Sequence, residues 1–230
     1  MAKKDASPAP HAEPRIKVSK NGPYLVSGGV PLTQVVIVTN AEGEPCEWRT
    51  VRAYAVRQKY ALCRCGESET RPFCDGTHAK AHFDGTETAS RKLYLDRAKE
   101  IEGPALRLTD ARDLCIGASF CTRAGGTWDL TRQSGDAQAR STAIEEAGNC
   151  PSGRLVVWAK EGKAIEPLFK PSIAVVADAE GEPSGALWAR GGIPVESADG
   201  TVYEVRYRVT LCGCGRSCNK PFCDGSHRER

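Results

Sequence analysis

Two stretches of the chain carry the residues best suited to chemistry, "CRCGESETRPFCDGTH" at 63–78 and "CGCGRSCNKPFCDGSH" at 212–227. In each, two cysteines stand two positions apart, and a third cysteine stands four positions before a histidine. Residues i and i+2 of a strand share a face, and residues i and i+4 of a helix are neighbours, so each pair can reach one metal. The candidate ligands are Cys63, Cys65, Cys74 and His78 in the first stretch, and Cys212, Cys214, Cys223 and His227 in the second.

Two occupants suit three thiolates and one imidazole. One is a single tetrahedral zinc ion, and the other is a [2Fe-2S] cluster with two protein ligands on each iron. Zinc sites usually take their cysteines from C-x2-C, whereas both stretches have C-x-C, which favours iron–sulfur. The remaining alternative is that the cysteines are simply buried and the histidines lie on the surface.

The full pattern, C-x-C-x2-S-x3-P-x-C-D-G-[S/T]-H, stands twice in the chain and resembles the CDGSH (NEET) iron–sulfur family. The only departure is Thr77 in place of serine. The resemblance implies one [2Fe-2S] cluster in each stretch, held by its three cysteines and its histidine, and a role in electron transfer or in handing clusters to acceptor proteins. Relatives with one motif resemble homodimers, so two motifs imply a monomer with an internal pseudo-dimer and a shared β-cap.

A histidine ligand has physical consequences. A neutral imidazole in place of a thiolate removes one negative charge, so the site should accept an electron more readily than an all-cysteine site. Imidazole also takes up a proton more readily than a metal-bound thiolate. The sequence therefore predicts a pH-dependent potential and acid-labile clusters.

Three further cysteines stand between the two stretches, Cys115, Cys121 and Cys150. "DLCIGASFC" and "NCPSG" resemble a small bacterial ferredoxin in which Ala118 replaces the middle cysteine, as in [3Fe-4S] ferredoxins. One hypothesis is a [3Fe-4S] cluster on these three thiolates. The alternative is a ferredoxin-like region without a cluster, acting as a spacer or a partner surface, its cysteines being plain buried residues.

Several residues of the two motifs are candidates for supporting roles. Asp75 and Asp224 are expected to be N-caps of short helices that carry the histidines; the alternative is that they hydrogen-bond the backbone near the cluster. Ser68 and Ser217 are candidates for donating a hydrogen bond to a cluster sulfur. The cations near the sites offset cluster charge or are solvated; they are Arg64, Arg71 and Lys220. The cysteines that fit no ligand set are Cys46 and Cys218, and His82 is expected on the surface.

Alternation of apolar and polar residues just before each motif predicts strands that feed the ligands. Two further segments resemble each other across the chain, "VVIVTNAEGEP" at 35–45 and "IAVVADAEGEP" at 173–183. A second pair, at 22–32 and 185–195, occurs in the opposite order, so the repeat is not a simple tandem copy. In the middle, "TRQSGDAQARS" is expected to be an exposed loop, the segment after it a helix, and 155–159 a strand.

The expected fold class is α+β, with small β-rich modules, two CDGSH-type lobes, a shared β-cap and a ferredoxin-like insert. The expected domains are a disordered arm, a first CDGSH domain with its strands, a ferredoxin-like domain and a second CDGSH domain. Their boundaries are 1–14, 15–85, 86–165 and 166–230.

Composition narrows the function classes. A net charge of +3 is too weak to argue for nucleic acid, and no apolar run is long enough to span a membrane. The 11 cysteines and the lack of an export signal favour a reducing cytoplasm, where clustered cysteines bind metals. No nucleotide loop or nucleophile–base pair is present, so an enzyme is not expected. The predicted partners are redox or cluster-acceptor proteins; the alternative is a redox- or iron-sensing module whose clusters switch a partner.

Overall fold

The computed structural model describes residues 13–178 and 181–228. The predicted arm at 1–14 lies outside the described residues except for its last two positions. The fold is mixed α+β, with mostly small β-sheets and few helices, as the sequence predicted. Among the described residues, no helix is long and apolar enough to cross a membrane.

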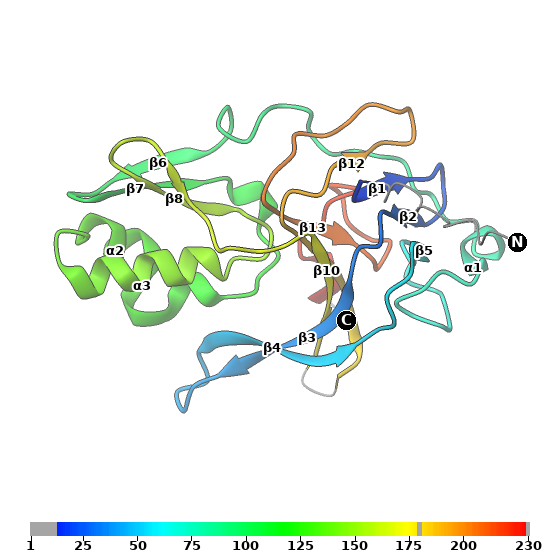
Figure 1. Cartoon of the computed structure of the whole chain (residues 1–230), viewed down its shortest axis with the longest axis horizontal. Helices are drawn as coiled ribbons and strands as arrows, with labels where there is room; N and C mark the ends of the chain where they lie inside the picture. The colour runs from blue at the N-terminus through cyan, green and yellow to red at the C-terminus, as the bar shows by residue number, and fades with distance from the viewer. Residues whose placement is uncertain (1–12, 179–180, 229–230) are drawn as a thin grey trace, which may run out of the picture.

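Two of the three sheets combine strands from both ends of the chain (Figure 1). The first has the order β12-β1-β2-β5 and the second β13-β11-β10-β3-β4. The strands of the first sheet are β1 (Arg15–Val18), β2 (Tyr24–Ser27), β5 (Lys59–Leu62) and β12 (Val195–Glu196). Those of the second are β3 (Leu32–Thr39), β4 (Pro45–Ala53), β10 (Ser172–Ala177), β11 (Pro183–Arg190) and β13 (Arg208–Cys212).

The two halves of the chain exchange one strand each. In the first half β3 leaves β2 and pairs in parallel with β10, and in the second half β12 leaves β11 and pairs in parallel with β1. A Gly-Gly turn precedes each exchanged strand. Gly28 and Gly191 have positive φ, and a Cβ at either would lie 2.6 Å from backbone atoms at the start of its own half. Only glycine allows this close approach, so the same turn redirects the chain in both halves.

The exchange explains the inverted order of the sequence repeats. The described residues of the similar segments at 35–45 and 173–183 belong to the antiparallel pairs β3–β4 and β10–β11, which lie beside each other in the second sheet, with Val35 opposite Val176. The similar segments at 22–32 and 185–195 instead occupy equivalent places in different sheets. One buried apolar cluster unites these strands, and Ile16, Ile173 and Leu211 within it are fully buried.

The middle region has its own sheet, with the order β6-β7-β8-β9, and its own buried cluster. Its strands are β6 (Lys99–Glu102), β7 (Leu106–Asp110), β8 (Leu155–Ala159) and β9 (Ala164–Ile165), and its α-helices are α2 (Thr127–Arg132) and α3 (Ala137–Gly148). Two 3-10 turns precede the helices, Arg112–Leu114 and Phe120–Gly125. The strand predicted at 155–159 is confirmed.

The prediction of a loop at "TRQSGDAQARS" (131–141) is wrong, because this segment contains the end of α2 and the start of α3. Asp136 starts α3 by accepting a hydrogen bond from the Ala139 amide at 2.8 Å. Polar residues cover the outer face of this helix, while Ala139, Ala143 and Ala147 pack inward. Small inward residues give a weak apolar signal, which is why polarity alone indicated a loop.

A buried carboxyl links the two helices and predicts a pH-dependent stability. Burial raises the pKa of Glu146 from 4.5 to about 7, although its Oε2 accepts a hydrogen bond from Thr127 at 2.7 Å. Because the folded state binds the proton more tightly, this contribution to stability is present below pH 4.5 and is lost as the pH rises to about 7. The loss amounts to about 2–3 kcal/mol, and we expect Glu146→Gln to abolish most of it in denaturant unfolding measured from pH 5 to 8. Identical slopes in the two proteins would contradict this expectation.

Candidate metal centres

Each C-x-C pair lies at the end of a strand. Cys63 follows β5, and Cys212 ends β13. Beyond each strand the chain turns back and pairs with it, with Leu62 opposite Phe73 and Leu211 opposite Phe222. This return brings the third cysteine of each motif to the strand that carries the first two. The amide of Cys74 donates to the Ala61 carbonyl at 3.0 Å, and the equivalent bond in the second motif is 2.8 Å long.

The two sulfurs of each C-x-C pair are 3.7 Å apart, both between Cys63 and Cys65 and between Cys212 and Cys214. Two ligands at about 2.3 Å from one tetrahedral metal are separated by roughly 3.8 Å. Each pair is therefore spaced to bind one metal.

The third cysteine and the histidine form a second pair. The Cys74 sulfur lies 3.4 Å from Nδ1 of His78, and the Cys223 sulfur lies 3.2 Å from Nδ1 of His227. Sulfur and nitrogen ligands of one tetrahedral metal are separated by about 3.5 Å. The histidine is carried by α1 (Thr77–Lys80) in the first motif and by a 3-10 turn (Ser226–Arg228) in the second.

The four ligands of a motif do not converge on one point. Among the described residues, no group of three or more His, Cys, Asp or Glu side chains is placed to hold a single metal ion. The donors are arranged as two pairs, with sulfur facing sulfur in one and sulfur facing nitrogen in the other. A binuclear group with one donor pair on each metal would fit this arrangement.

The thiols lie among groups that favour a metal-bound thiolate. Backbone amides of Gly66 and Gly225 donate to Cys63 and Cys223 sulfurs at 3.3 and 3.4 Å. Burial raises the pKa of Cys65 to about 11 and that of Cys223 to about 12. Without a metal, Cys65 and Cys223 hold their protons, so metal binding to these two thiols releases protons and depends on pH.

The aspartates of the motifs brace the loops rather than cap helices. Gly76, in a left-handed conformation, occupies the N-cap of α1, so the predicted cap at Asp75 is wrong. The Asp75 carboxylate instead accepts from the amides of Thr77 and Glu69 at 3.0 and 2.8 Å. Asp224 does the same for Ser226 and Cys218 in the second motif. These bonds join the ligand turn to the loop between the ligand pairs.

The motif serines do not point their hydroxyl hydrogens at the ligands. Ser68 donates to the Phe73 carbonyl at 2.6 Å, and Ser217 donates to the Phe222 carbonyl at 2.7 Å. The predicted donation to a cluster sulfur is therefore wrong, since the single hydrogen is already used. Arg64 is not a solvated cation either. It is 1% exposed and donates to the carbonyls of Ser19, Gly22 and Gly85.

The loops that carry the C-x-C pairs of the two motifs contact each other through their backbones. A Cβ at Gly66 would lie 2.7 Å from the Cys214 carbonyl oxygen, and a Cβ at Gly215 would meet the Cys65 carbonyl oxygen in the same way. Both glycines have positive φ. The contacts are reciprocal, as they are across a two-fold axis.

The three cysteines of the middle region also come together. Cys115, Cys121 and Cys150 line one small cavity with Phe120 and Leu155. Burial, together with the smaller effect of the neighbouring Cys150 and Cys115 thiols, raises the pKa of Cys121 to about 11. Three thiols around one cavity are candidate ligands for a metal group.

Sequence reasoning missed the arginine of this middle site. Arg154 donates to the Cys115 sulfur at 3.2 Å, and its guanidinium is held by both oxygens of Asp110 at 2.6 and 2.8 Å. Such a bidentate pair fixes the cation in position. The only sequence signal is its position four residues after Cys150, which is not specific.

Two family models match the chain. One, described as an iron-binding zinc finger of CDGSH type, matches residues 21–79 and 184–228. The other, described as a divergent 4Fe-4S mono-cluster, matches residues 101–160. Comparison with curated proteins and with solved structures gives no significant match. The chain therefore contains two regions of the iron-binding CDGSH type with a divergent 4Fe-4S region between them.

Proposed function

We propose that the chain binds two [2Fe-2S] clusters and acts, without catalysis of its own, in electron transfer or cluster transfer. The observation that carries the proposal is the paired arrangement of ligands, present twice. In each motif two sulfurs are 3.7 Å apart, and a sulfur and an imidazole nitrogen are 3.4 or 3.2 Å apart. A [2Fe-2S] cluster takes two protein ligands on each iron, which accounts for the pairing.

The strand exchange supports a monomer whose two sites form an internal pseudo-dimer. Parallel pairs β1–β12 and β3–β10 tie each half to the other, and the ligand loops meet through reciprocal glycine contacts. A chain that completes both sheets by itself needs no second copy to assemble the pair of sites. The strands of both halves then form a shared β-cap over the two ligand loops.

The sheets shared by the two halves favour an electron or cluster carrier over a redox or iron sensor. The ligand-bearing strands β5 and β13 lie in sheets that include both halves, and their apolar cluster is fully buried. A packed, hydrogen-bonded frame changes little when an electron is gained or lost. A sensor would instead change shape or partner affinity with the state of its clusters.

The middle region is proposed to bind a further cluster through Cys115, Cys121 and Cys150. Three thiolates match a [3Fe-4S] cluster directly, whereas a [4Fe-4S] cluster would need a fourth ligand. The match of residues 101–160 to a divergent 4Fe-4S family favours the [4Fe-4S] type.

Iron and acid-labile sulfide per chain, measured with a visible spectrum on protein purified without oxygen, test the proposal. Two [2Fe-2S] clusters require about four irons and four sulfides. A middle [3Fe-4S] cluster raises these to about seven and eight, and a [4Fe-4S] cluster raises them to about eight and eight. Colourless protein that contains zinc would overturn the proposal.

A ligand exchange tests the role of the histidines. His78→Cys replaces a neutral imidazole by a thiolate and adds one negative charge, so we expect a lower reduction potential at the first site. Redox titration of the visible spectrum measures it. His82→Ala, which alters an exposed histidine four residues later, is the matched control and should leave the potential unchanged. A rise or no change in His78→Cys would contradict the proposed ligand.

A further inference from the structure

We infer that the three-cysteine site of the middle region and the second CDGSH site form one coupled unit, and that the middle site is coupled much more weakly to the first CDGSH site. Filling the second site then holds the ligand segments of the middle site in place, and filling the middle site has the reciprocal effect. The inference rests on the proposed function, because it assumes that the sites bind clusters.

The turn between Cys223 and His227 of the second CDGSH site packs directly against the segment of the middle site that begins at Cys115. A Cβ at Gly225 would lie 3.4 Å from the Cys115 carbonyl oxygen and 3.5 Å from Ile116, and the Arg228 guanidinium donates to the Gly117 carbonyl. At the equivalent glycine of the first motif, Gly76, nothing lies within 4 Å of such a Cβ. The same turn is therefore covered by the middle region in one copy and open in the other.

Buried side chains continue this contact inward. Cys223, a ligand of the second site, belongs to the same apolar cluster as Ile116 and Trp188. Trp48 packs against Trp188 and Phe120, with ring centroids 5.1 and 5.0 Å apart. Aromatic pairs at these distances are favourable beyond the area they bury. The packing therefore links Cys223 to the residue that precedes Cys121 in the chain.

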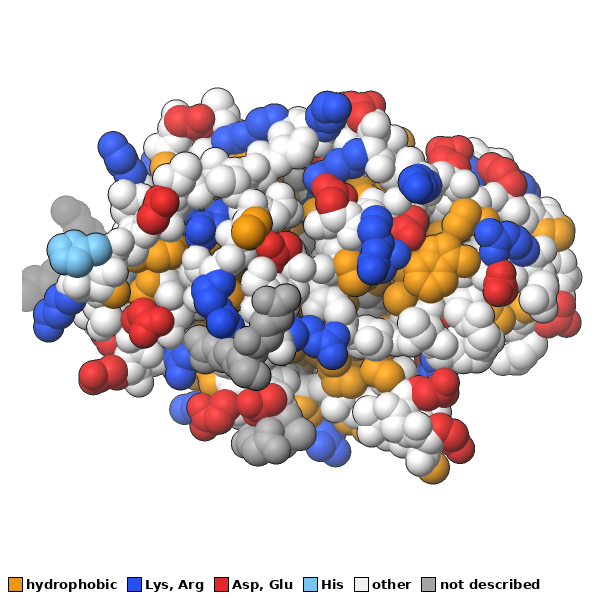
Figure 2. All heavy atoms as spheres, turned by 180° about the vertical axis from the view of Figure 1, so that it is seen from behind, with side chains coloured by type: hydrophobic (Ala, Val, Ile, Leu, Met, Phe, Trp, Pro, Cys, Tyr) orange, Lys and Arg blue, Asp and Glu red, His pale blue; other side chains and the backbone are white. Residues whose placement is uncertain are grey.

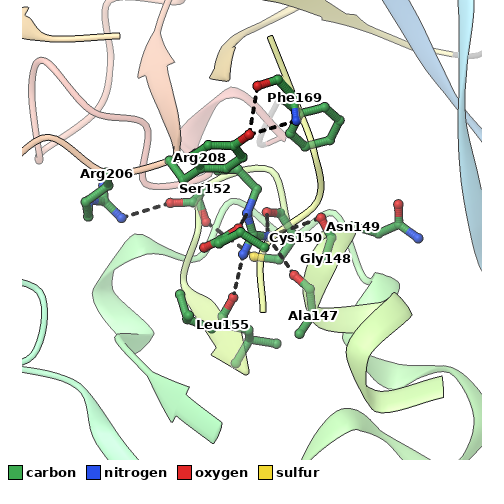
Figure 3. A network of polar contacts seen from close by, with 12 residues as sticks. Ala147, Gly148, Asn149, Cys150, Ser152, Leu155, Phe169, Arg206 and Arg208 are labelled. Carbon is green, nitrogen blue, oxygen red and sulfur yellow. Dashed lines mark hydrogen bonds and ion pairs between the residues drawn. The ribbon is translucent and has the colours of Figure 1, made fainter. Parts of the chain in front are cut away.

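The other ligand segment of the middle site is held by β13, the strand that ends at Cys212. Arg208 of this strand is 1% exposed, and its guanidinium donates to the carbonyls of Cys150, Ala147 and Leu155 at 2.7, 2.6 and 3.1 Å (Figure 3). It also pairs with Glu166 at 2.6 Å. A charged group bonded this way in a buried position transmits displacement of the strand to the segment around Cys150.

The first motif lacks the residues that make these contacts. In the alignment of the two motifs, Arg208 corresponds to Lys59, which is exposed, and Arg228 corresponds to Ala79. The contacts that Arg208 and Arg228 make with the middle region therefore occur in the second copy and have no counterpart at Lys59 and Ala79. Coupling carried by a contiguous packed network should follow the same asymmetry.

Hydrogen exchange of the complete, anaerobically purified chain tests the inference. Cys223→Ser empties the second site and Cys74→Ser empties the first. We expect exchange at 115–121 and 149–155 to become several-fold faster in Cys223→Ser and to stay near the unmodified rate in Cys74→Ser. Equal acceleration in the two variants, acceleration in Cys74→Ser only, or no acceleration in either would overturn the inference.

The reciprocal effect is measured as iron loss to a chelator. Cys121→Ser, added to Cys74→Ser, should speed iron loss from the second site several-fold, whereas the same change added to Cys223→Ser should leave the first site unaffected. Equal effects on the two sites would contradict the coupling. Absence of iron from both CDGSH sites of the unmodified protein would instead overturn the proposed function, so the two failures are distinguishable.

Discussion

Cys74→Ser is expected to remove about two irons and two sulfides from each chain and to leave the second CDGSH site filled. The Cys74 sulfur is half of a pair with His78, and the serine hydroxyl that replaces it is a poor ligand for iron. With only three ligands left, the first cluster should not survive purification. Iron and sulfide analysis, with the visible spectrum recorded on the same sample, measures the loss.

The second motif offers a matched pair of variants within a few residues. Cys223→Ser should cause the same loss at the other site, because its sulfur lies 3.2 Å from Nδ1 of His227. Cys218→Ser alters an exposed cysteine of the same loop and should cost no iron. Far-UV circular dichroism should show that each variant keeps its sheets. Iron loss in Cys218→Ser, or full iron in Cys74→Ser with the fold intact, would show that the ligand set is wrong.

Arg208→Met is expected to lower the free energy of unfolding by about 3–5 kcal/mol, the usual cost of removing one partner of a buried ionic network. The change removes the guanidinium that donates to the Glu166 carboxylate and to the carbonyls of Ala147, Cys150 and Leu155. For a chain of this size the melting temperature should fall by roughly 10 °C. Thermal unfolding followed by circular dichroism checks this.

An exposed arginine of the same region provides the control. Arg132 pairs with Asp129 at 2.6 Å, but their side chains are 56% and 63% exposed. Arg132→Met should therefore change stability by less than about 0.5 kcal/mol. If both variants lost equal stability, the loss would come from arginine removal in general and not from the buried network.

Figure 2 shows acidic and basic side chains interspersed over one face of the molecule, with hydrophobic side chains exposed between them. On this face the charges form no large patch of one sign. Binding to redox or acceptor proteins, and the lack of binding to nucleic acid, stay predictions from the sequence.

The metal-binding chemistry was readable from the sequence because it depends on residue types at short spacings. The C-x-C pairs and the C-x3-H pairs are local, so strand and turn geometry bring their atoms together with little help from the rest of the chain. The strand at 155–159 was equally readable, since its apolar residues form one uninterrupted run. The helix around 137–148 was only partly readable, because alanines give a weak apolar signal.

Only the tertiary structure decided how the two halves combine. The parallel pairing of β1 with β12 and of β3 with β10 joins residues far apart in the chain, and no local pattern encodes a partner strand. The same holds for the buried arginines. Arg64 and Arg208 resemble surface cations in the sequence, yet each is buried where several backbone carbonyls converge from distant segments. Local spacing therefore determined how the candidate ligands pair, whereas long-range packing determined which CDGSH region the middle region contacts.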